Sequence, residues 1–163
     1  MIRFVLVFLL AFSLALLVAY YATSLALPIF QELLAAIVPL TVVTGTLSYA
    51  LYSYVESVLK DVSSDEKVKG LEGFGATIQT LTSLKREILV NAFAVIALLL
   101  IERFAHGLSL IFPVTENEPF NWYWAIAISV RVACFASSAV VAAVQFRGFL
   151  IANDYRAVIS RAK

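Results

Sequence analysis

The sequence predicts an all-α, polytopic membrane protein with four transmembrane helices in a single domain, residues 1–163. The composition is 62% hydrophobic and 14% charged, with a mean hydropathy of +0.93, whereas soluble domains are about half apolar and about a quarter charged. The apolar residues lie in four runs, and about 20 such residues are enough to cross the ~30 Å hydrocarbon core. Lysine and arginine gather in alternate connecting segments, as expected for a chain that crosses a membrane repeatedly.

We expect the first span to cover about residues 4–26, a run rich in leucine, valine and phenylalanine. It is longer than the ~7–15 residues of a signal-peptide core, so we interpret it as an uncleaved span. Tyr20 and Tyr21 lie near its end, where aromatic side chains anchor helices at the membrane interface. Pro28 interrupts the apolar run, and we expect the chain to reverse direction there.

The second span is expected at about residues 30–55. Pro39 and Gly45 weaken this helix, and several threonine and serine hydroxyls lie close by. Neighbouring helices and hydroxyls satisfy the backbone groups that proline frees, so such helices persist in membranes, with a kink near Pro39. Residues 56–87 then form the largest polar segment. We expect it to begin as a solvated loop and, from Phe74, to become an amphipathic helix that runs directly into the third span.

The third and fourth spans are expected at about residues 88–112 and 122–146. The turn between them contains two prolines and two acidic residues but no basic residue. A basic tail, residues 147–163, follows the fourth span. Cys134 lies within that span and is interpreted as a small packing residue, because a single cysteine cannot form an intramolecular disulfide.

The positions of the basic residues predict the orientation of the chain. Ten of the 12 lysine and arginine residues precede the first span or lie in the 56–87 segment or the tail, and the two turns on the opposite side contain none. The positive-inside rule therefore places both ends of the chain in the cytoplasm. Because the net charge is only +1, we expect no direct contact with nucleic acid.

Two opposite charges fall at similar depths in adjacent spans. Arg131 lies nine positions after Trp122, roughly 13 Å along its helix, and Glu102 lies ten positions before Phe112, roughly 15 Å along the antiparallel one. A charge within a span costs at least ~2.5–3.5 kcal/mol, so the sequence predicts that the two form an ion pair. Such a pair is interpreted as a structural clasp that sets register. The alternative is a proton or ion path, or a switch.

A candidate outer-face polar cluster consists of Glu32, Arg103 and His106. Arg103 and His106 lie closer to the outer surface than Glu102, and Glu32 near the start of the second span is a candidate partner for Arg103. His106 is interpreted as an interfacial histidine, with a pH-sensing role as the alternative, since an unperturbed histidine titrates near pH 6.5. The sequence offers no credible ligand set for a metal, and we expect no metal and no cofactor.

A stripe of small residues follows one side of the fourth span, with one member in every four positions: Ala125, Ser129, Ala133 and Ser137. Such stripes allow two helix backbones to approach closely. The sequence leaves open whether the stripe packs within the chain or against a second copy.

The layout resembles the small four-span membrane proteins of bacterial phage exclusion and anti-phage defence, including the membrane subunit of Kiwa-type systems. The resemblance rests on the hydroxyl-rich second span PLTVVTGTLSYALY, the charged segment with GFGATIQTL, and a third span interrupted by polar residues. The resemblance covers the architecture of the chain and includes no diagnostic motif. No functional residue of that family is assigned to this chain. The resemblance implies a multi-pass sensor in the bacterial inner membrane that works with a cytoplasmic effector and forms a homo-oligomer.

We therefore expect a non-enzymatic sensor or scaffold subunit, in contact with the lipid bilayer, that binds a cytoplasmic protein through residues 56–87 and 147–163. No nucleophile–base pair is visible, and about 30 residues of cytoplasmic loop are too few to bury an active site. The main alternative is a small homo-oligomeric ion-conducting pore or transporter subunit, lined by the charged residues of the third and fourth spans.

Overall fold

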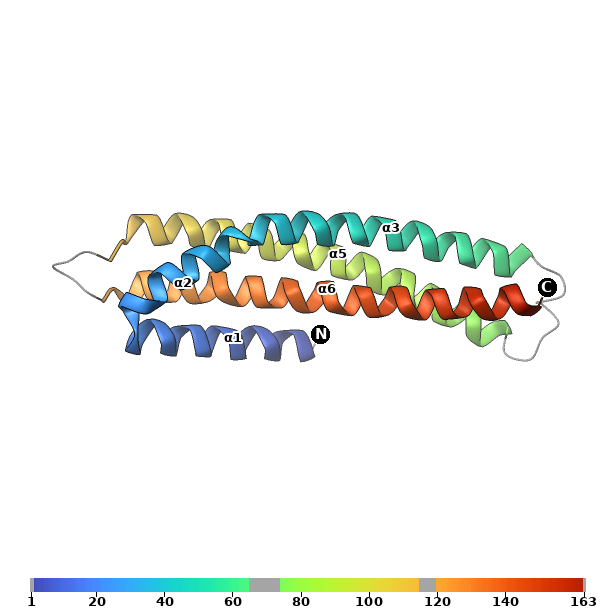
Figure 1. Ribbon diagram of the computed structural model, residues 1–163, viewed down its shortest axis with the longest axis horizontal. Helices are drawn as coiled ribbons and strands as arrows, with labels where there is room; N and C mark the ends of the chain where they lie inside the picture. Colours follow the sequence, from blue (N-terminus) through green and yellow to red (C-terminus); the bar gives the residue numbers. More distant parts are fainter. Residues whose placement is uncertain (1, 65–73, 115–119, 163) are drawn as a thin grey trace. The chain divides into compact units, whose positions relative to one another are not determined.

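The computed structural model describes residues 2–64, 74–114 and 120–162, of which 95% are α-helical and none are in a strand. The all-α prediction is confirmed for these residues. Figure 1 shows the helices, which are α1 (Ile2–Tyr21), α2 (Thr23–Ala35), α3 (Ile37–Ser64), α5 (Phe74–Ile111) and α6 (Trp122–Ala162).

Four stretches of the described residues are long and apolar enough to cross a membrane: Phe4–Tyr21, Pro28–Ser64, Phe74–Ile111 and Trp122–Asp154. This agrees with the predicted number of spans. Large apolar side chains on α1 point away from the protein, and Leu10 and Leu14 are 63% and 62% exposed. A soluble monomer rarely exposes a continuous apolar face of this kind, so the surface of α1 is compatible with a multi-pass membrane protein.

The chain folds as two compact units, which are described separately. Unit 1 comprises Met1–Val42 and Val95–Val140, and unit 2 comprises Val43–Ala94 and Val141–Lys163. The helices α3, α5 and α6 each contribute residues to both units.

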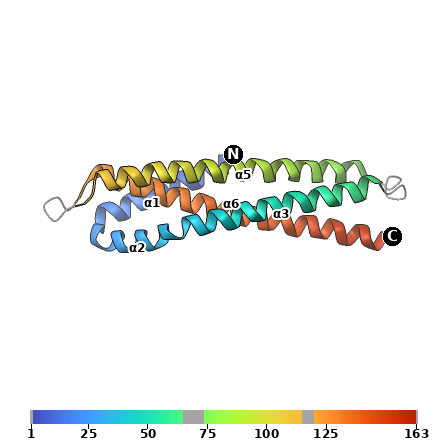
Figure 2. The same cartoon turned by 90° about the horizontal axis from the view of Figure 1, so that it is seen from above.

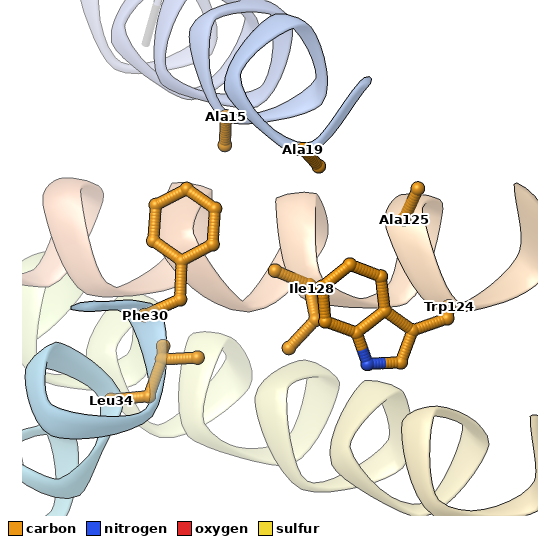
Figure 3. Close-up of a cluster of buried hydrophobic side chains, with 7 residues drawn as sticks. All are labelled: Ala15, Ala19, Phe30, Leu34, Trp124, Ala125 and Ile128. Atoms are coloured by element: carbon orange, nitrogen blue, oxygen red, sulfur yellow. The ribbon is translucent and has the colours of Figure 1, made fainter. Parts of the chain in front are cut away.

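The core of unit 1 combines very small and very large side chains. Ala15 and Ala19 of α1 and Ala125 of α6 belong to the same buried cluster as Trp124 and Phe30 (Figure 3). The alanines allow α1 to approach α6 closely, and the aromatic rings fill the space beside them. A second cluster joins α3, α5 and α6 through Ile37, Leu98 and Cys134.

The core of unit 2 is built on a repeated apolar pattern in α3. Leu51, Val55, Val58 and Val62 are all buried and recur every three or four residues, which places them on one face of the helix. Leu81 and Ile88 of α5 and Ala152 of α6 complete the cluster.

A buried polar contact also links α6 and α3 within unit 2. Gln145 Nε2 donates to Ser48 Oγ at 2.6 Å, and Ser48 Oγ in turn donates to the Thr44 carbonyl at 2.7 Å. These side chains are at most 4% exposed. The hydrogen bonds satisfy Gln145 Nε2 and Ser48 Oγ, which would otherwise be costly to bury, whereas Gln145 Oε1 has no partner among the described protein atoms.

The first predicted turn lies at a different residue from the one expected. The predicted span 4–26 is interrupted at Ala22, whose φ of −138° and ψ of 46° are not helical, and Figure 2 shows α1 and α2 meeting at this turn. Pro28 lies inside α2, so the expected reversal at Pro28 is wrong. Proline removes only one backbone donor from a helix, and helices in membranes tolerate that loss.

The predicted span 30–55 is two helices rather than one. α2 ends at Ala35 and α3 begins at Ile37, so the helix is interrupted in the turn that precedes Pro39. Pro39 has no N–H to donate to the carbonyl four residues earlier, and its ring crowds that turn. The predicted kink near Pro39 is therefore observed as this interruption.

Two helices are longer than the spans predicted from hydropathy. α3 continues to Ser64 instead of ending at 55, because Val58 and Val62 extend its buried face. α6 continues to Ala162 instead of leaving the helix at 146, and its 41 residues span about 60 Å, roughly twice the hydrocarbon thickness. α5 begins at Phe74 and continues without a break to Ile111, which confirms that the amphipathic segment joins the third span.

Candidate functional site

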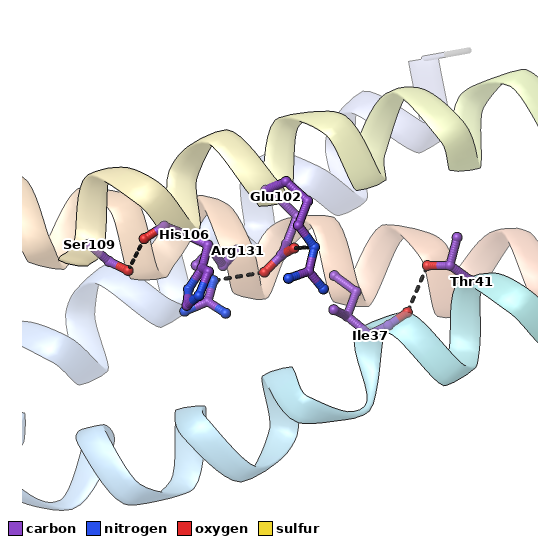
Figure 4. Close-up of polar contacts among 7 residues, drawn as sticks. Ile37, Thr41, Glu102, His106, Ser109 and Arg131 are labelled. Atoms are coloured by element: carbon purple, nitrogen blue, oxygen red, sulfur yellow. Dashed lines mark hydrogen bonds and ion pairs between the residues drawn. The ribbon is translucent and has the colours of Figure 1, made fainter. Parts of the chain in front are cut away.

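The most unusual feature of unit 1 is a buried ion pair between two membrane-type helices. Arg131 Nε of α6 donates to Glu102 Oε1 of α5 at 2.8 Å (Figure 4). The Glu102 side chain is fully buried and that of Arg131 is 11% exposed. A hydrogen bond between a guanidinium and a carboxylate at this distance is short and charge-assisted. The structure thus brings together the two charges that the sequence places at matching depth.

Helix geometry explains why the two residues meet. Glu102 lies nine residues before Ile111, the last residue of α5, and Arg131 lies nine residues after Trp122, the first residue of α6. Both positions are about 13 Å from their helix ends, so an antiparallel arrangement of the two helices sets them at the same level.

A second arginine lies beside the same carboxylate. Arg103 Nε is 3.3 Å from Glu102 Oε2, and the Arg103 side chain is 50% exposed. Glu102 Oε2 accepts no hydrogen bond from the described protein atoms, so this contact is an ion pair without hydrogen-bond geometry. One buried carboxylate therefore faces two guanidinium groups.

Arg103 and Arg131 line a cavity of about 590 Å³ within unit 1. Its polar lining residues are Gln31 of α2, Arg103, His106 and Ser109 of α5, and Arg131 of α6. Apolar side chains complete the wall, among them Leu34, Leu110, Trp124 and Ile128. This volume is within the ~300–1,000 Å³ typical of ligand pockets.

His106 and Ser109 contact each other only through the backbone. Ser109 Oγ donates to the His106 carbonyl at 2.7 Å, and Figure 4 draws this contact near the ion pair. His106 Nδ1 is buried and has no hydrogen-bond partner among the described protein atoms. Because the hydroxyl is directed to the backbone and not to the ring, these two residues do not form a nucleophile–base pair.

The structure joins two of the three residues in the candidate outer-face cluster. Arg103 and His106 line the cavity, whereas Glu32 is exposed and is not one of its lining residues. The partner of Arg103 is its sequence neighbour Glu102 and not Glu32. The expected Glu32–Arg103 contact is thus absent from the described residues, because α2 directs Gln31, and not Glu32, toward the cavity.

The small-residue stripe of α6 packs inside the chain. Ala125, Ser129, Ala133 and Ser137 are all 0% exposed. Ala125 belongs to the cluster that contains Ala15 and Ala19 of α1, and Ser129 Oγ donates to the Ala125 carbonyl at 2.7 Å. Of the two arrangements that the sequence left open, the structure contains the intramolecular one.

Sequence reasoning missed the cavity and two of its polar residues, Gln31 and Ser109. Ser109 lies three residues after His106, on the same helix face, and that spacing could have drawn attention to it. No group of three or more histidine, cysteine, aspartate or glutamate residues in the described ranges could hold a metal ion.

Comparison with known proteins leaves the site to be interpreted from its geometry. No protein-family model, curated protein or solved structure matches the chain. The arrangement consists of a buried carboxylate, two arginines that each contact one of its oxygens, and a partly apolar cavity that both arginines line. Such a group can bind a ligand and respond to it by changing its ion pairing.

Proposed function

We propose that the chain is a non-enzymatic membrane sensor subunit of a bacterial complex, with the cavity of unit 1 as its sensing site. The observation that carries the proposal is the Glu102–Arg131 pair, buried next to a cavity that also contains Arg103. Charges within membrane spans are costly and generally serve a function. A purely structural clasp needs one acid and one base, whereas this site has a second arginine at 3.3 Å.

The second arginine offers Glu102 an alternative partner, and the two pairings are the two states of the proposed sensor. Glu102 can pair chiefly with Arg131 or chiefly with Arg103, and a ligand that takes one guanidinium from the carboxylate strengthens the other pairing. A ligand shifts such an equilibrium only through different affinities for the two states. Because Arg131 belongs to α6 and both other residues belong to α5, a change in pairing alters the contact between these helices.

The proposed output is recruitment of a cytoplasmic effector through residues 56–87 and 147–163. In the described part of these segments the helices continue well past the ends expected from hydropathy, and unit 2 has a buried apolar core beneath an exposed charged surface. Lys60, Asp61, Arg86, Glu87 and Arg147 all lie on that surface. Residues 65–73 lie outside the described ranges. Placement in a defence complex of the bacterial inner membrane, as a homo-oligomer without cofactor, rests on the resemblance in architecture.

The proposed topology places both chain ends and the 56–87 segment in the cytoplasm. We expect a cysteine at Ser64 to be protected from a membrane-impermeant thiol reagent on intact cells, and a cysteine at Asn117, outside the described residues, to be labelled. Both are made in a Cys134→Ser background. The support is the absence of lysine and arginine from the two opposite turns. Labelling at Ser64 and protection at Asn117 would reverse the topology, and permeabilised cells provide the positive control.

The function is tested by phage infection of bacteria that carry the chain together with its neighbouring genes. We expect Arg103→Gln to abolish protection, measured as efficiency of plating, while the amount of protein in the membrane stays normal. Arg103 is half exposed, so its loss should not unfold the chain. The control is Glu32→Gln, an exposed change that leaves the cavity lining intact. Equal protection by wild type and Arg103→Gln would contradict a sensing role for the cavity.

The alternative is a small pore or transporter subunit, and the polar cavity is the observation that favours it. Purified protein reconstituted into liposomes separates the two functions, since a pore conducts ions without a partner. The sensor proposal expects no ion flux above that of empty liposomes. Flux that disappears in Arg103→Gln would favour the pore.

A further inference from the structure

We propose that the cavity of unit 1 binds one phosphate group, carried by an anionic phospholipid headgroup or by free phosphate. The proposal deepens the proposed function, because it names the ligand class of the same cavity. It rests on three observations: the charge balance of the site, its unused hydrogen-bond donors, and the combination of polar and apolar walls.

The charge balance of the site is positive. Arg103 and Arg131 each contribute a positively charged guanidinium group. Glu102 contacts both of them and supplies one negative charge. None of the described residues that line the cavity is acidic, and Glu32 is not among them. An anion in the cavity would neutralise the remaining charge, which lies within a stretch apolar enough to cross a membrane.

The donors of the site exceed its acceptors. A guanidinium carries five N–H donors, and Arg131 uses its Nε for Glu102. Arg103 has no hydrogen bond of its own to Glu102 Oε2, which accepts none. The amide of Gln31 also lines the cavity. The buried Nδ1 of His106, which has no partner among the described protein atoms, becomes a further donor if the ring is protonated at that atom. Planar guanidinium groups match the oxygens of phosphate, often with two parallel hydrogen bonds.

The walls of the cavity suit an amphiphile. The two arginines and His106, on α5 and α6, form the polar part of the wall. Leu34, Trp124 and other apolar side chains form the rest of it. The cavity volume of about 590 Å³ accommodates a phosphate together with part of the group that it esterifies. A free phosphate would occupy the polar part alone.

The depth of the site is compatible with a lipid headgroup. His106 and Arg103 lie five and eight residues before the end of α5, about 7 and 12 Å along the helix. The polar headgroup region adds about 5–8 Å to each side of the hydrocarbon core. A long arginine side chain extends toward that region while its stem stays among apolar groups. Such an extension shortens the distance between the Arg103 guanidinium and a lipid phosphodiester.

The binding experiment uses the purified, delipidated full-length chain in a non-ionic detergent. Melting is followed with a thiol-reactive fluorogenic dye, because the single cysteine, Cys134, is fully buried in the folded state. One arm titrates dioleoyl phosphatidylglycerol against zwitterionic dioleoyl phosphatidylcholine, and the other titrates sodium phosphate against sodium chloride at equal ionic strength. Stabilisation by phosphatidylglycerol alone identifies a lipid source, and stabilisation by both ligands identifies phosphate itself.

The site is tested with matched variants in the same titrations. We expect Arg103→Gln to bind at least about tenfold more weakly, the loss expected for one charged hydrogen-bonding group. Arg103→Lys should retain part of the affinity, because it keeps the charge but not the planar donors. Arg86→Gln, an exposed change outside the cavity, should bind as wild type does.

Two results would overturn the proposal. One is a melting temperature that neither phosphate ligand raises more than its control does. The other is an equal rise in melting temperature for wild type, Arg103→Gln and Arg103→Lys, which would indicate binding elsewhere on the surface. If Arg103→Gln does not fold, the comparison of wild type with Arg103→Lys decides. If Arg103→Gln loses phosphate binding but keeps full phage protection, the phosphate site is supported and the sensor function is refuted.

Discussion

Replacing Glu102 with glutamine is expected to destabilise the folded chain by about 3–5 kcal/mol, the range measured when one member of a buried ion pair is removed. Glu102 is the only carboxylate within reach of Arg103 and Arg131 in the described structure. Its loss leaves one nearly buried and one half-exposed guanidinium without an opposite charge. The penalty comes from these unpaired cations more than from the lost contact.

Replacing the partner residue instead, Arg131→Gln, should lower the free energy of unfolding by less than Glu102→Gln does. Glu102 would then keep Arg103, whose Nε already lies 3.3 Å from Oε2. The double variant Glu102→Gln/Arg131→Gln should recover part of the stability lost by Glu102→Gln, since it removes opposite charges together. The charge swap of the two residues should also recover part of it. In a simple clasp with two members each single change strands one charge, whereas here Arg131→Gln leaves Glu102 with Arg103 as a second partner.

The measurement is the free energy of unfolding and the folded yield in detergent, followed through the accessibility of the Cys134 thiol. The exposed change Glu32→Gln is the control and should stay within about 0.5 kcal/mol of wild type. Strictly additive losses in the double variant would show that Glu102 and Arg131 do not interact. Normal yield of every variant, with phage protection lost, would assign the pair to sensing and not to stability.

The sequence predicts this pair because both residues can be located by counting along helices. The number of residues from each helix end determines depth, and a short connection makes neighbouring helices antiparallel. Glu32 was a candidate partner for Arg103 from its position near the start of the second span, and the described structure pairs Arg103 with Glu102 instead. Depth does not determine which side of a helix faces inward, and the orientation of α2 depends on the turn at Ala22 and the interruption at Ala36.

The cavity could not be derived in this way, because it depends on the rotation of three helices. Gln31, His106 and Arg131 have no common sequence signal, and they line one space only once α2, α5 and α6 are packed. The hydrogen bond from Gln145 to Ser48 joins residues 97 positions apart and is equally invisible to local patterns. The end of α3 was missed for a related reason. Averaged hydropathy assigns Val58 and Val62 to a polar segment, yet both residues continue the buried face of the helix.

The packing of the α6 stripe leads to the second large effect. Replacing both Ser129 and Ala133 with leucine should destabilise the folded chain, each change by about 1–3 kcal/mol, because both sites are fully buried and a larger side chain overpacks a buried site. Both residues are 0% exposed, and Ala125 on the same stripe already packs in one cluster with two alanines of α1. The added methyl groups would push apart helices whose approach depends on small side chains.

The matched control is Ala143→Leu, an exposed alanine on the same helix, which should change stability by no more than about 0.5 kcal/mol. Thermal stability and native mass in mild detergent are measured on the same samples. If the stripe were a contact between copies, the leucines would reduce the native mass and leave the stability of each chain unchanged. We expect the opposite, a large loss of stability at unchanged mass in whatever protein remains folded. A wild-type chain that is monomeric in mild detergent would contradict the proposed homo-oligomer independently of the stripe.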